Sequence, residues 1–461
     1  MTLALAATFG LCACAVGPDY VRPATPAGVA WNAPLEGGLA ALPPDQAALA
    51  SFWTTLGDPQ LTELIERALA ANLDVAAAQA RLKQTRALRK VAIGEFFPTI
   101  TATAGPERIA TRNSSKDLYS AGLDASWEID VFGRLRRNLE AANAERDASV
   151  EDLHEVLVSL AAELALSYVD MRALQERLRI ALATEEAQSQ TFDLTDWRAK
   201  AGLTTELDVD RARTSLATTQ AVIPSLRTAL AADANGIAIL LGEQPGAVSD
   251  LLDDPKPIPV TPLEVAVGVP AEALLQRPDV RRAERALAAE TARVGVVTAS
   301  AYPSLNALGT IGLEALTPSG LFQAGVWTGT LAATAAQTLF SGGQILGNIE
   351  AEDAVREQVL ASYQLTVLSA LGEVENALVA YAQEQERRTA LADGTAAAER
   401  ALVLAQDQYG SGLIDFQVVL DSQRALYLLQ DQLAASEGQV TSDLVRLYKA
   451  IGGGWTPEAT S

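Results

Sequence analysis

The sequence predicts a mainly α-helical protein built as two structural repeats, each with two β-strands and long coiled-coil-like helices. Two observations support this prediction. Between Ser120 and about Leu178 a strand pattern changes directly into a very long helix pattern, and the same succession recurs in the second half of the chain. The distance between equivalent positions is 208 residues from Phe132 to Phe340. This is far too long for a solenoid unit and indicates a duplicated half.

The bulk composition excludes some functional classes. The chain has 461 residues, and a hydrophobic content of 49% against 20% charged residues excludes general disorder. The formal net charge is −22. Nucleic acid is therefore not an expected partner, because a phosphate backbone needs a basic surface. An acidic chain suits a periplasmic or extracellular location, and acidic groups inside a pore would favour cations.

The N-terminal residues predict secretion and lipid attachment. Residues 1–13 are small and apolar and too short to span a bilayer, which is typical of a signal peptide. The sequence Leu11-Cys12-Ala13-Cys14 resembles the lipobox of bacterial lipoproteins, so we expect Cys14 to carry covalent lipid that ties the chain to a membrane surface. Residues 14–50 contain six prolines and predict an extended tether without folded elements.

The first repeat is expected over residues 51–242. It begins with a short helix and an Ala-rich helix over residues 72–95, which Gly94 and Pro98 end. A strand follows at residues 99–104, and a second strand over residues 120–131 alternates apolar with polar side chains. A helix of about 65 residues, on the order of 95 Å long, then runs to Arg198. Its heptad seam comprises Leu153, Leu157, Leu160, Leu164, Ser167, Met171, Leu174 and Leu178.

Further glycines and prolines divide the rest of the chain. Gly202 separates the long helix from a returning helix over residues 206–240, and residues 243–270 are a Pro-rich linker. The second repeat, residues 271–452, predicts a helix that Pro303 ends, then two strands, a second long helix and a last helix after Gly412. Residues 453–461 form a tail.

Four strands cannot complete a structure by themselves. They leave two edges with unpaired backbone groups, and a closed barrel needs about eight strands. The apolar alternate face, which includes Trp127, has no predicted helix to cover it. If this face meets lipid, the strands must complete a membrane β-barrel with other copies of the chain. The sequence therefore predicts a homo-oligomeric tube, part strand and part helix.

Several motifs, in order along almost the whole chain, resemble the TolC family of outer-membrane factors. They are Leu275-Gln276-Arg277-Pro278-Asp279-Val280, Ala301-Tyr302-Pro303-Ser304, Leu339-Phe340-Ser341-Gly342-Gly343 and the paired Gly-Leu breaks. The lipobox followed by Gly17-Pro18-Asp19-Tyr20 is similar to the lipoprotein branch, the OprM- and NodT-like efflux channels.

This resemblance implies a homotrimer with a twelve-stranded barrel in the bacterial outer membrane and a helical barrel across the periplasm. It implies a passive exit duct that exports small molecules such as drugs or toxic compounds in a tripartite efflux system. The implied partners are a periplasmic adaptor, an inner-membrane pump of the RND type and outer-membrane lipid.

The resemblance also assigns roles to the two helix breaks, which in the family form the periplasmic tip. The tip residues that it implies as adaptor contacts are Gly202, Leu203, Asp208, Arg211, Gly412 and Leu413. The gate residues that it implies are Asp421, Arg424 and Gln417. A ring of Asp421 carboxylates near an axis would attract cations and would be held by the arginines.

The residues themselves predict no enzyme, no cofactor other than the lipid on Cys14, and no metal site. The single histidine, His154, has no second histidine or nucleophile beside it, and no phosphate-binding loop is present. Glu373 and Glu375 are expected to be solvated. Two alternatives stay open: an outlet for type I protein secretion, and a pore-less lipid-anchored coiled-coil scaffold, against which the strand pattern counts.

Overall fold

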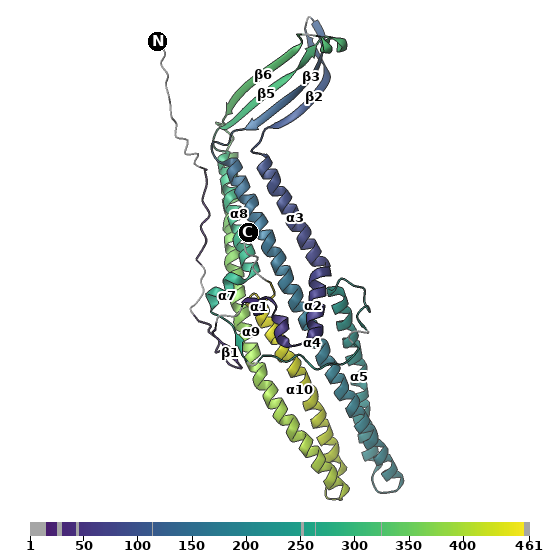
Figure 1. The fold of residues 1–461 in the computed structure, drawn as a ribbon. Coiled ribbons are helices and arrows are strands. Elements are labelled where there is room, and N and C mark those ends of the chain that lie inside the picture. The colour runs from purple at the N-terminus through teal and green to yellow at the C-terminus, as the bar shows by residue number, and fades with distance from the viewer. Residues whose placement is uncertain are drawn as a thin grey trace. The chain divides into compact units, whose positions relative to one another are not determined.

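The computed structural model describes residues 15–24, 30–42, 46–112, 114–249, 253–262, 264–323 and 325–455. The predicted signal segment and the predicted lipidation site, Cys14, lie outside these residues. Both halves show the same element order, which Figure 1 traces. The first half contains α3 (Leu73–Gly94), β2 (Thr99–Thr111), β3 (Ser114–Glu128), α4 (Arg134–Lys200) and α5 (Glu206–Leu240). The second half contains α8 (Pro278–Ala299), β5 (Ser304–Ala315), β6 (Trp327–Ala336), α9 (Gln344–Gly410) and α10 (Phe416–Ala450).

The helix lengths support the duplication. The long helices α4 and α9 each have 67 residues, and the returning helices α5 and α10 each have 35. The chain divides into two compact units, and each unit takes corresponding parts of both halves. The first comprises the described parts of residues 1–24, 80–151 and 281–366, and the second comprises the described remainder. The predicted boundaries of the repeats and the linker stay predictions.

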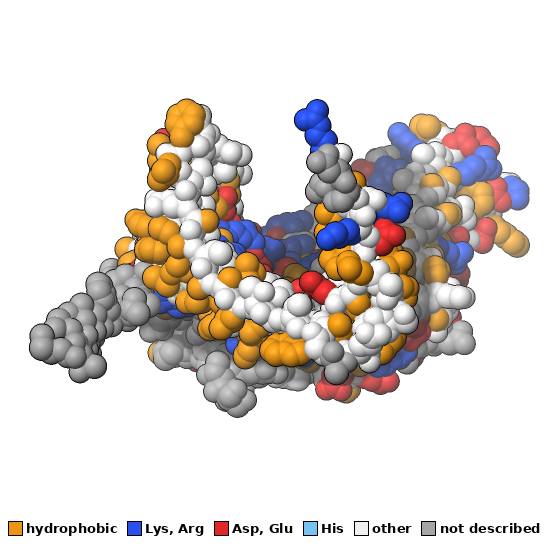
Figure 2. All heavy atoms as spheres, turned by 90° about the horizontal axis from the view of Figure 1, so that it is seen from above, with side chains coloured by type: hydrophobic (Ala, Val, Ile, Leu, Met, Phe, Trp, Pro, Cys, Tyr) orange, Lys and Arg blue, Asp and Glu red, His pale blue; other side chains and the backbone are white. Residues whose placement is uncertain are grey.

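In the first unit the four strands form one antiparallel sheet in the order β2-β3-β5-β6. Because alternate residues point to opposite faces, each row of paired residues belongs to one face. One row contains Ile100, Ala125, Gly309 and Leu331, and the next contains Thr101, Asp124, Thr310 and Thr330. The sheet therefore has an apolar face and a polar face. Figure 2 shows hydrophobic side chains gathered along one side of the strand layer.

The predicted alternation in the second strand is confirmed, but β3 begins six residues before Ser120, at Ser114, and ends at Glu128, before the predicted end at residue 131. The apolar face is exposed in the isolated chain: Ile311 is 60% exposed and Leu331 is 88% exposed. The sheet has β2 and β6 as its edges. Within the described chain, neither edge has a second strand beside it.

The abrupt change from strand to helix has a local cause. The carboxylate of Asp130 accepts hydrogen bonds from the backbone N–H groups of Leu135, at 3.2 Å, and Arg136, at 3.0 Å. It thereby satisfies donors in the first turn of α4 that have no partner inside the helix. Gly133 between them has φ +87°, where glycine avoids a steric penalty. Asp130 and Gly133 together end β3 and start α4.

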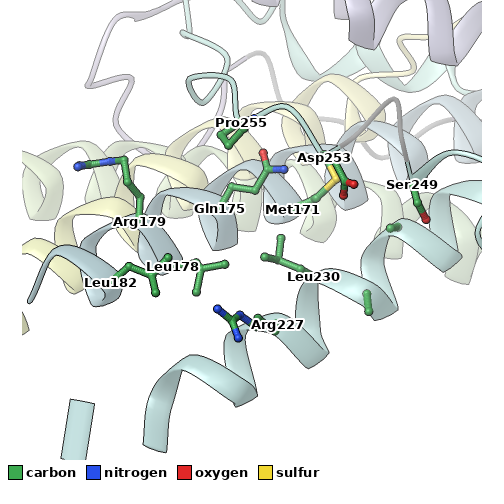
Figure 3. A pocket seen from close by; sticks show the side chains of 12 residues that line it. Met171, Gln175, Leu178, Arg179, Leu182, Arg227, Leu230, Ser249, Asp253 and Pro255 are labelled. Atoms are coloured by element: carbon green, nitrogen blue, oxygen red, sulfur yellow. The ribbon is translucent and has the colours of Figure 1, made fainter. Parts of the chain in front are cut away.

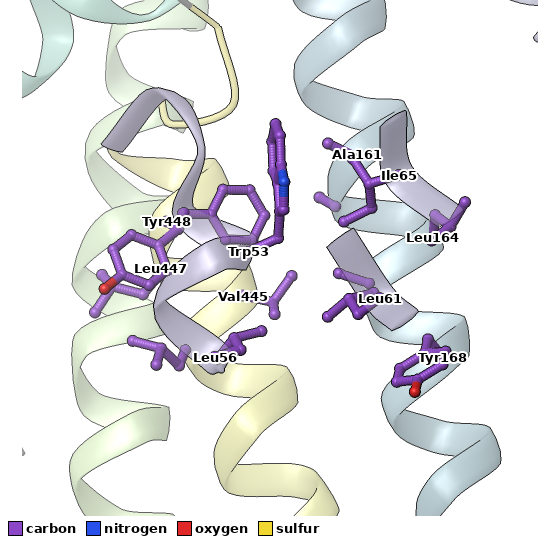
Figure 4. Packing of buried hydrophobic residues seen from close by; sticks show 14 of the residues in the cluster. Trp53, Leu56, Leu61, Ile65, Ala161, Leu164, Tyr168, Val445, Leu447 and Tyr448 are labelled. Carbon is purple, nitrogen blue, oxygen red and sulfur yellow. The ribbon is translucent and has the colours of Figure 1, made fainter. Parts of the chain in front are cut away.

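The second unit has a large hydrophobic core where a helical turn (Phe52–Leu56) and α2 (Pro59–Ala71) pack between the long helices. Phe52 contacts both Trp53 and Tyr448 of α10, with ring centres 5.5 and 5.2 Å apart. Figure 4 shows Leu61 near Tyr168 of α4. Of the predicted heptad seam, Leu160, Leu164 and Met171 are buried, and its other members are half-buried. The helical periodicity thus identifies the buried stripe of α4.

A charged side chain lies inside this core. Arg172 of α4 is 0% exposed. Its guanidinium donates to the side-chain oxygen of Gln60 at 2.7 Å, to that of Gln175 at 2.6 Å and to the carbonyl of Asp254 at 2.9 Å. These hydrogen bonds join α2, α4 and the linker at one point.

The prediction of a tether without folded elements is wrong for the described part of residues 30–50. Strand β1 (Leu39–Ala40) pairs in parallel with β4 (Val265–Ala266), and α1 covers Gln46–Ala50. The Trp31 indole donates to the carbonyl of Gly268 at 3.1 Å, and the backbone N–H groups of Asn32 and Ala33 donate to Glu375. The segment is ordered because its few apolar side chains pack on the core. The prediction that Glu373 and Glu375 are solvated is therefore wrong for their hydrogen bonding. Glu375 accepts from the backbone of Asn32 and Ala33, and Glu373 accepts from the Arg277 guanidinium at 2.7 Å.

The prediction of a single helix from Ala271 toward Pro303 is also wrong. The chain forms α7 (Pro270–Gln276) and α8, which are separated at Arg277. Pro278 disfavours a helical conformation for the residue before it, and Arg277 is extended with ψ 123°. The Arg277 guanidinium is buried and donates to the carbonyl of Ala450 at 2.7 Å. It therefore holds the end of α10 at this break.

We expect the substitution Arg172→Met to destabilise the protein. It removes the guanidinium donors of the buried Gln60 oxygen and of the Asp254 carbonyl, at a cost of about 2–4 kcal/mol in the free energy of unfolding. The thermal midpoint followed by circular dichroism in detergent should fall by several degrees. The control is Arg179→Met on the same helix, which removes an exposed pair with Glu176 and should cost less than about 1 kcal/mol. Equal shifts for both variants would contradict the role assigned to Arg172.

Candidate functional site

The candidate site is the pair of hairpin tips where α4 turns into α5 and α9 turns into α10. In the first tip, the backbone N–H of Gly202 donates to the carbonyl of Ala199 and that of Leu203 donates to Arg198, both at 2.9 Å. This is a Schellman motif, which ends a helix by satisfying its last carbonyls. Gly202 has φ +75°, a conformation that suits glycine.

The second tip repeats this geometry. Gly412 also has φ +75° and donates to Tyr409 at 3.0 Å, and Leu413 donates to Gln408 at 2.9 Å. The two leucines are presented alike, with Leu203 76% exposed and Leu413 75% exposed. The structure therefore places the four predicted Gly-Leu residues at equivalent positions, with an apolar side chain in solvent at each tip.

In the first tip, Asp208 has a structural role that the sequence analysis did not predict. It is the third residue of α5, and its carboxylate accepts from the hydroxyls of Thr204 at 2.7 Å and Thr205 at 2.9 Å. Thr205 caps the helix in return, which completes a capping box. Burial raises the pKa of Asp208, but the hydrogen bonds from both threonines and the charge of Arg211 outweigh it. The pKa of Asp208 therefore lies below its ordinary value.

In the second tip, the three residues assigned to the gate lie together on α10. The Gln417 side-chain amide donates to both carboxylate oxygens of Asp421, at 2.9 and 3.0 Å. The Arg424 guanidinium lies 3.8 Å from the same carboxylate. Asp421 and Arg424 are 58% and 46% exposed. The arrangement leaves Asp421 accessible, with one hydrogen-bonding partner and one long ion pair.

A small aromatic core joins the two hairpins just behind the tips. Phe416, Val419 and Leu420 of α10 are buried against Ala212 of α5 and Ala405 of α9. Beside this core, the Arg198 guanidinium lies 4.9 Å from the ring centre of Tyr409, a cation–π contact. Sequence analysis missed these residues, although the spacing of three and one between Phe416, Val419 and Leu420 is that of a buried helix stripe.

The apolar face of the sheet has aromatic residues at both ends. At the foot, the Trp127 indole donates to the carbonyl of Phe96 at 3.0 Å, and Phe132 stacks on Tyr302. At the other end, Tyr119 and Trp327 belong to the same face. Trp127 and Tyr119 are eight residues apart on β3, about 27 Å along the strand. An apolar band between aromatic girdles is typical of strands in a bilayer.

A groove of about 470 Å³ lies between α4 and α5, beside the linker. Figure 3 shows its apolar wall of Met171, Leu178 and Leu230, with Arg227 and Asp253 at its borders. No residue predicted to function lines it. His154 stacks on Trp455 with ring centres 4.3 Å apart, which is a packing contact in the second unit. Among the described residues, no helix combines the length and apolarity that a bilayer crossing requires.

Comparison with known proteins identifies the family of this chain. The model of the outer membrane efflux protein family matches residues 64–243 and 269–453, most of the chain. The chain belongs to the outer membrane efflux protein family. The resemblance to TolC-type outer-membrane factors is thereby confirmed, and the chain is an outer-membrane efflux channel of a bacterium. Its family is one of transport proteins and not of enzymes.

Individual relatives match this chain over nearly their whole length and agree with this assignment. The chain is 30% identical to nodulation protein T of Rhizobium leguminosarum bv. trifolii, covering 97% of this chain and 96% of the relative. It is 29% identical to the toluene efflux pump outer membrane protein TtgF of Pseudomonas putida, covering 98% and 96%. The solved structure of the outer-membrane channel OprN has 34% identity and a TM-score of 0.91, with 96% and 100% covered.

We expect acid to loosen the first tip through Asp208. Because its pKa is depressed in the folded protein, its stabilising contribution is present above the ordinary aspartate pKa, near 4, and is lost as pH falls below that value. Amide hydrogen exchange at residues 204–209, corrected for the intrinsic rate, should accelerate between pH 6 and pH 3. In Asp208→Asn this acceleration should shrink. An unchanged acceleration in that variant would show that another group controls the tip.

Proposed function

We propose that three copies of this chain form the exit duct of a tripartite efflux pump, through which small organic molecules pass from the periplasm to the exterior. The observation that carries this proposal is the four-stranded sheet with one apolar face, one polar face and two unpartnered edges. Three such sheets provide twelve strands, which suffice for a closed barrel with a lumen. Closure pairs the edge β6 of one copy with β2 of the next.

The two faces of the sheet indicate which side of the proposed barrel meets lipid and which side lines the lumen. The apolar rows with their aromatic borders face lipid, and the polar rows line the lumen. The lumen side is rich in hydroxyl groups, for example at Thr101, Thr310 and Thr330. Its Asp124 carboxylate accepts from Thr103 at 2.8 Å. The wall combines these hydroxyls with the carboxylates of Asp124, Glu128 and Glu314 on the same face, and a polar lumen of this kind suits amphipathic small molecules. Two of the relatives are named for toluene and solvent efflux.

The two tips are the end at which a periplasmic adaptor and an inner-membrane pump of the RND type engage the duct. The exposed Leu203 and Leu413 supply apolar contact points for the adaptor. Asp421, Arg424 and Gln417 form the gate, in which the carboxylates of three copies surround the axis and the arginines hold the closed state. Opening then moves the α10 tips apart. The chain itself performs no catalysis and uses no cofactor or metal, and lipid on Cys14 gives the duct a further attachment to the outer membrane.

The gate is tested by Asp421→Ala in planar bilayers. An exposed ion pair contributes up to about 1 kcal/mol. Three copies together therefore favour the closed state by up to about a hundredfold, since every 1.4 kcal/mol is tenfold. We expect the variant to raise the open probability by about tenfold to a hundredfold and to increase antibiotic entry into cells.

The matched control is Asp210→Ala, because Asp210 forms an exposed i,i+3 pair with Arg213 at 3.1 Å but is not assigned to the gate. The control should leave conductance and open probability at the wild-type level. If Asp421→Ala behaves like Asp210→Ala, the gate lies elsewhere in the channel.

A further inference from the structure

Two apolar clusters lie along the helices that lead to the tips, both inside the second compact unit. The first is the small aromatic core behind the tips. Its buried side chains come from α9 and α10, except Ala212 of α5. The second cluster lies farther from the tips, between α4 and α5, and its buried members are Ala181, Ile223 and Leu226. The section between the two clusters has a different kind of interior.

In that section the buried side chains are all polar. It comprises residues 182–191 of α4, 213–222 of α5, 383–404 of α9 and 421–433 of α10. Each helix contributes amide or hydroxyl groups without charge, where a buried helix stripe is normally apolar. The buried residues, which are 2–7% exposed, are Gln188 of α4, Ser215 and Thr219 of α5, Thr395 of α9 and Gln423 of α10. We call these five residues the polar layer.

The polar layer connects the two hairpins directly. The Gln423 side-chain amide of α10 donates to the Thr191 hydroxyl of α4 at 3.0 Å. That hydroxyl itself donates to the carbonyl of Ala187 at 2.8 Å. Thr191 therefore keeps a hydrogen bond if Gln423 moves away. Gln188 lies about one helical turn from Thr191 on the same side of α4.

Thr395 lies at the end of the polar layer that is farther from the tips. The point where a side chain at the neighbouring Gly394 would begin is 3.6 Å from the Leu429 side chain of α10. Leu429 is six residues beyond Gln423, about 9 Å along the helix. Because α4 and α10 run in opposite directions, Gln188 falls between these two levels. The polar layer therefore forms a continuous strip inside the bundle.

Three oxygens of the polar layer have no hydrogen-bonding partner among the described residues. They are the side-chain oxygens of Gln188, Thr395 and Gln423, and all three are buried. A buried polar atom without a partner costs free energy, and in folded proteins ordered water commonly supplies the partner. Neutral amide and hydroxyl groups suit water, and the polar layer has no charge that would select an ion.

The polar layer also lies where the second hairpin must yield if its tip moves. Farther from the tip, α9 is held in the large core by Val374, Leu378 and Tyr381, which are all 0% exposed. Interdigitated apolar side chains resist sliding, because any shift leaves gaps between them. A polar group can instead exchange a protein partner for water at little cost. Gly394 lowers the stability of α9 in this section, since glycine is a weak helix former.

We propose that the polar layer is an internal water site on which the second hairpin shifts. Water molecules bind the oxygens of Gln188, Thr395 and Gln423, and Gln423 exchanges Thr191 for water as α9 and α10 move against α4 and α5. The proposal rests on the gated duct proposed above and adds the place at which the motion occurs. The small aromatic core moves with the second hairpin and loses its contact with Ala212.

Amide hydrogen exchange of the full-length protein in lipid nanodiscs tests the water site. Residues 185–191 and 423–429 should exchange at least about tenfold faster than residues 174–181 and 434–445 of the same helices, after correction for intrinsic rates, because water reaches the polar layer.

Replacing the two glutamines tests the cause of this difference. Gln188→Met with Gln423→Met keeps the side-chain shape and leaves no donor unpaired, so it should slow exchange to the level of the flanks and raise the thermal midpoint by a few degrees. The control is Gln190→Met with Gln430→Met, which removes glutamines of the same two helices that bond to surface glutamates, and it should change neither quantity.

Planar bilayers test the motion. The Gln188→Met, Gln423→Met protein should open at least about tenfold less often than the wild type, since each hydrogen bond to water that is lost corresponds to about fivefold.

A second variant stiffens α9 and leaves the three oxygens in place. Gly394→Ala fits, because its new Cβ would meet Leu429 at an ordinary contact distance, and it should lower the opening frequency severalfold. Gly372→Ala is the matched control. It gains the same helix propensity on α9 near the large core, with no described heavy atom within 4 Å of its Cβ position, and should leave the opening frequency unchanged.

Exchange at the polar layer that is as slow as in the flanks would overturn the water site. A methionine pair that slows exchange but opens as often as the wild type would overturn its role in the motion, as would equal effects of Gly394→Ala and Gly372→Ala. In these cases the protein still conducts and the duct stands. A full-length protein that forms no channel in bilayers would instead overturn the duct and the motion with it, while the exchange rates would still decide whether water occupies the polar layer.

Discussion

The requirement that every backbone N–H and C=O group be paired inside a bilayer is the constraint on which the rest of this structure depends. The sheet satisfies it between β2 and β6 but not at its two edges. A helix pairs its own backbone, whereas a strand needs a neighbour on each side. The same chain can therefore be complete in its helices and incomplete in its strands. In the proposed oligomer, pairing with identical copies removes both edges.

The helical part follows from this constraint. Helix α3 leads into the edge strand β2 and helix α9 follows the edge strand β6, so closing the sheet in the proposed oligomer brings helices of different copies together. Duplication repeats the same lengths in both halves: α4 and α9 are equal, and so are α5 and α10, which places the breaks at Gly202 and Gly412 at equivalent positions. The equal geometry of these breaks gives the two tips matching Gly-Leu turns.

Sequence patterns predicted the elements of this fold well where one local rule decides the outcome. The four glycines at 202, 242, 412 and 452 all adopt positive φ at helix ends, because few other residues tolerate that conformation. The alternation around Trp127 identified the apolar face, and the Asp421–Arg424 spacing placed both residues on one side of α10. These features depend on near neighbours in the chain, which a single sequence records.

Features that depend on distant parts of the chain could not be predicted from local sequence patterns. Arg172 looks like any helical arginine until α2 and the linker supply its acceptors. The ordering of residues 30–42 requires Glu375, which lies more than 300 residues away. The turn at Arg277 was missed although Pro278 marked it, because the burial that stabilises the turn comes from α10.

The most direct test of the central claim is the environment of alternate residues on the edge strand β6 in lipid bilayers. Single cysteines at Leu331 and Thr330 can be labelled with a fluorophore in the reconstituted protein. The account predicts that a lipid-soluble quencher acts on position 331 and that a water-soluble quencher acts on position 330. Equal access of the water-soluble quencher to both positions would mean that the sheet has no lipid face, and it would contradict the account.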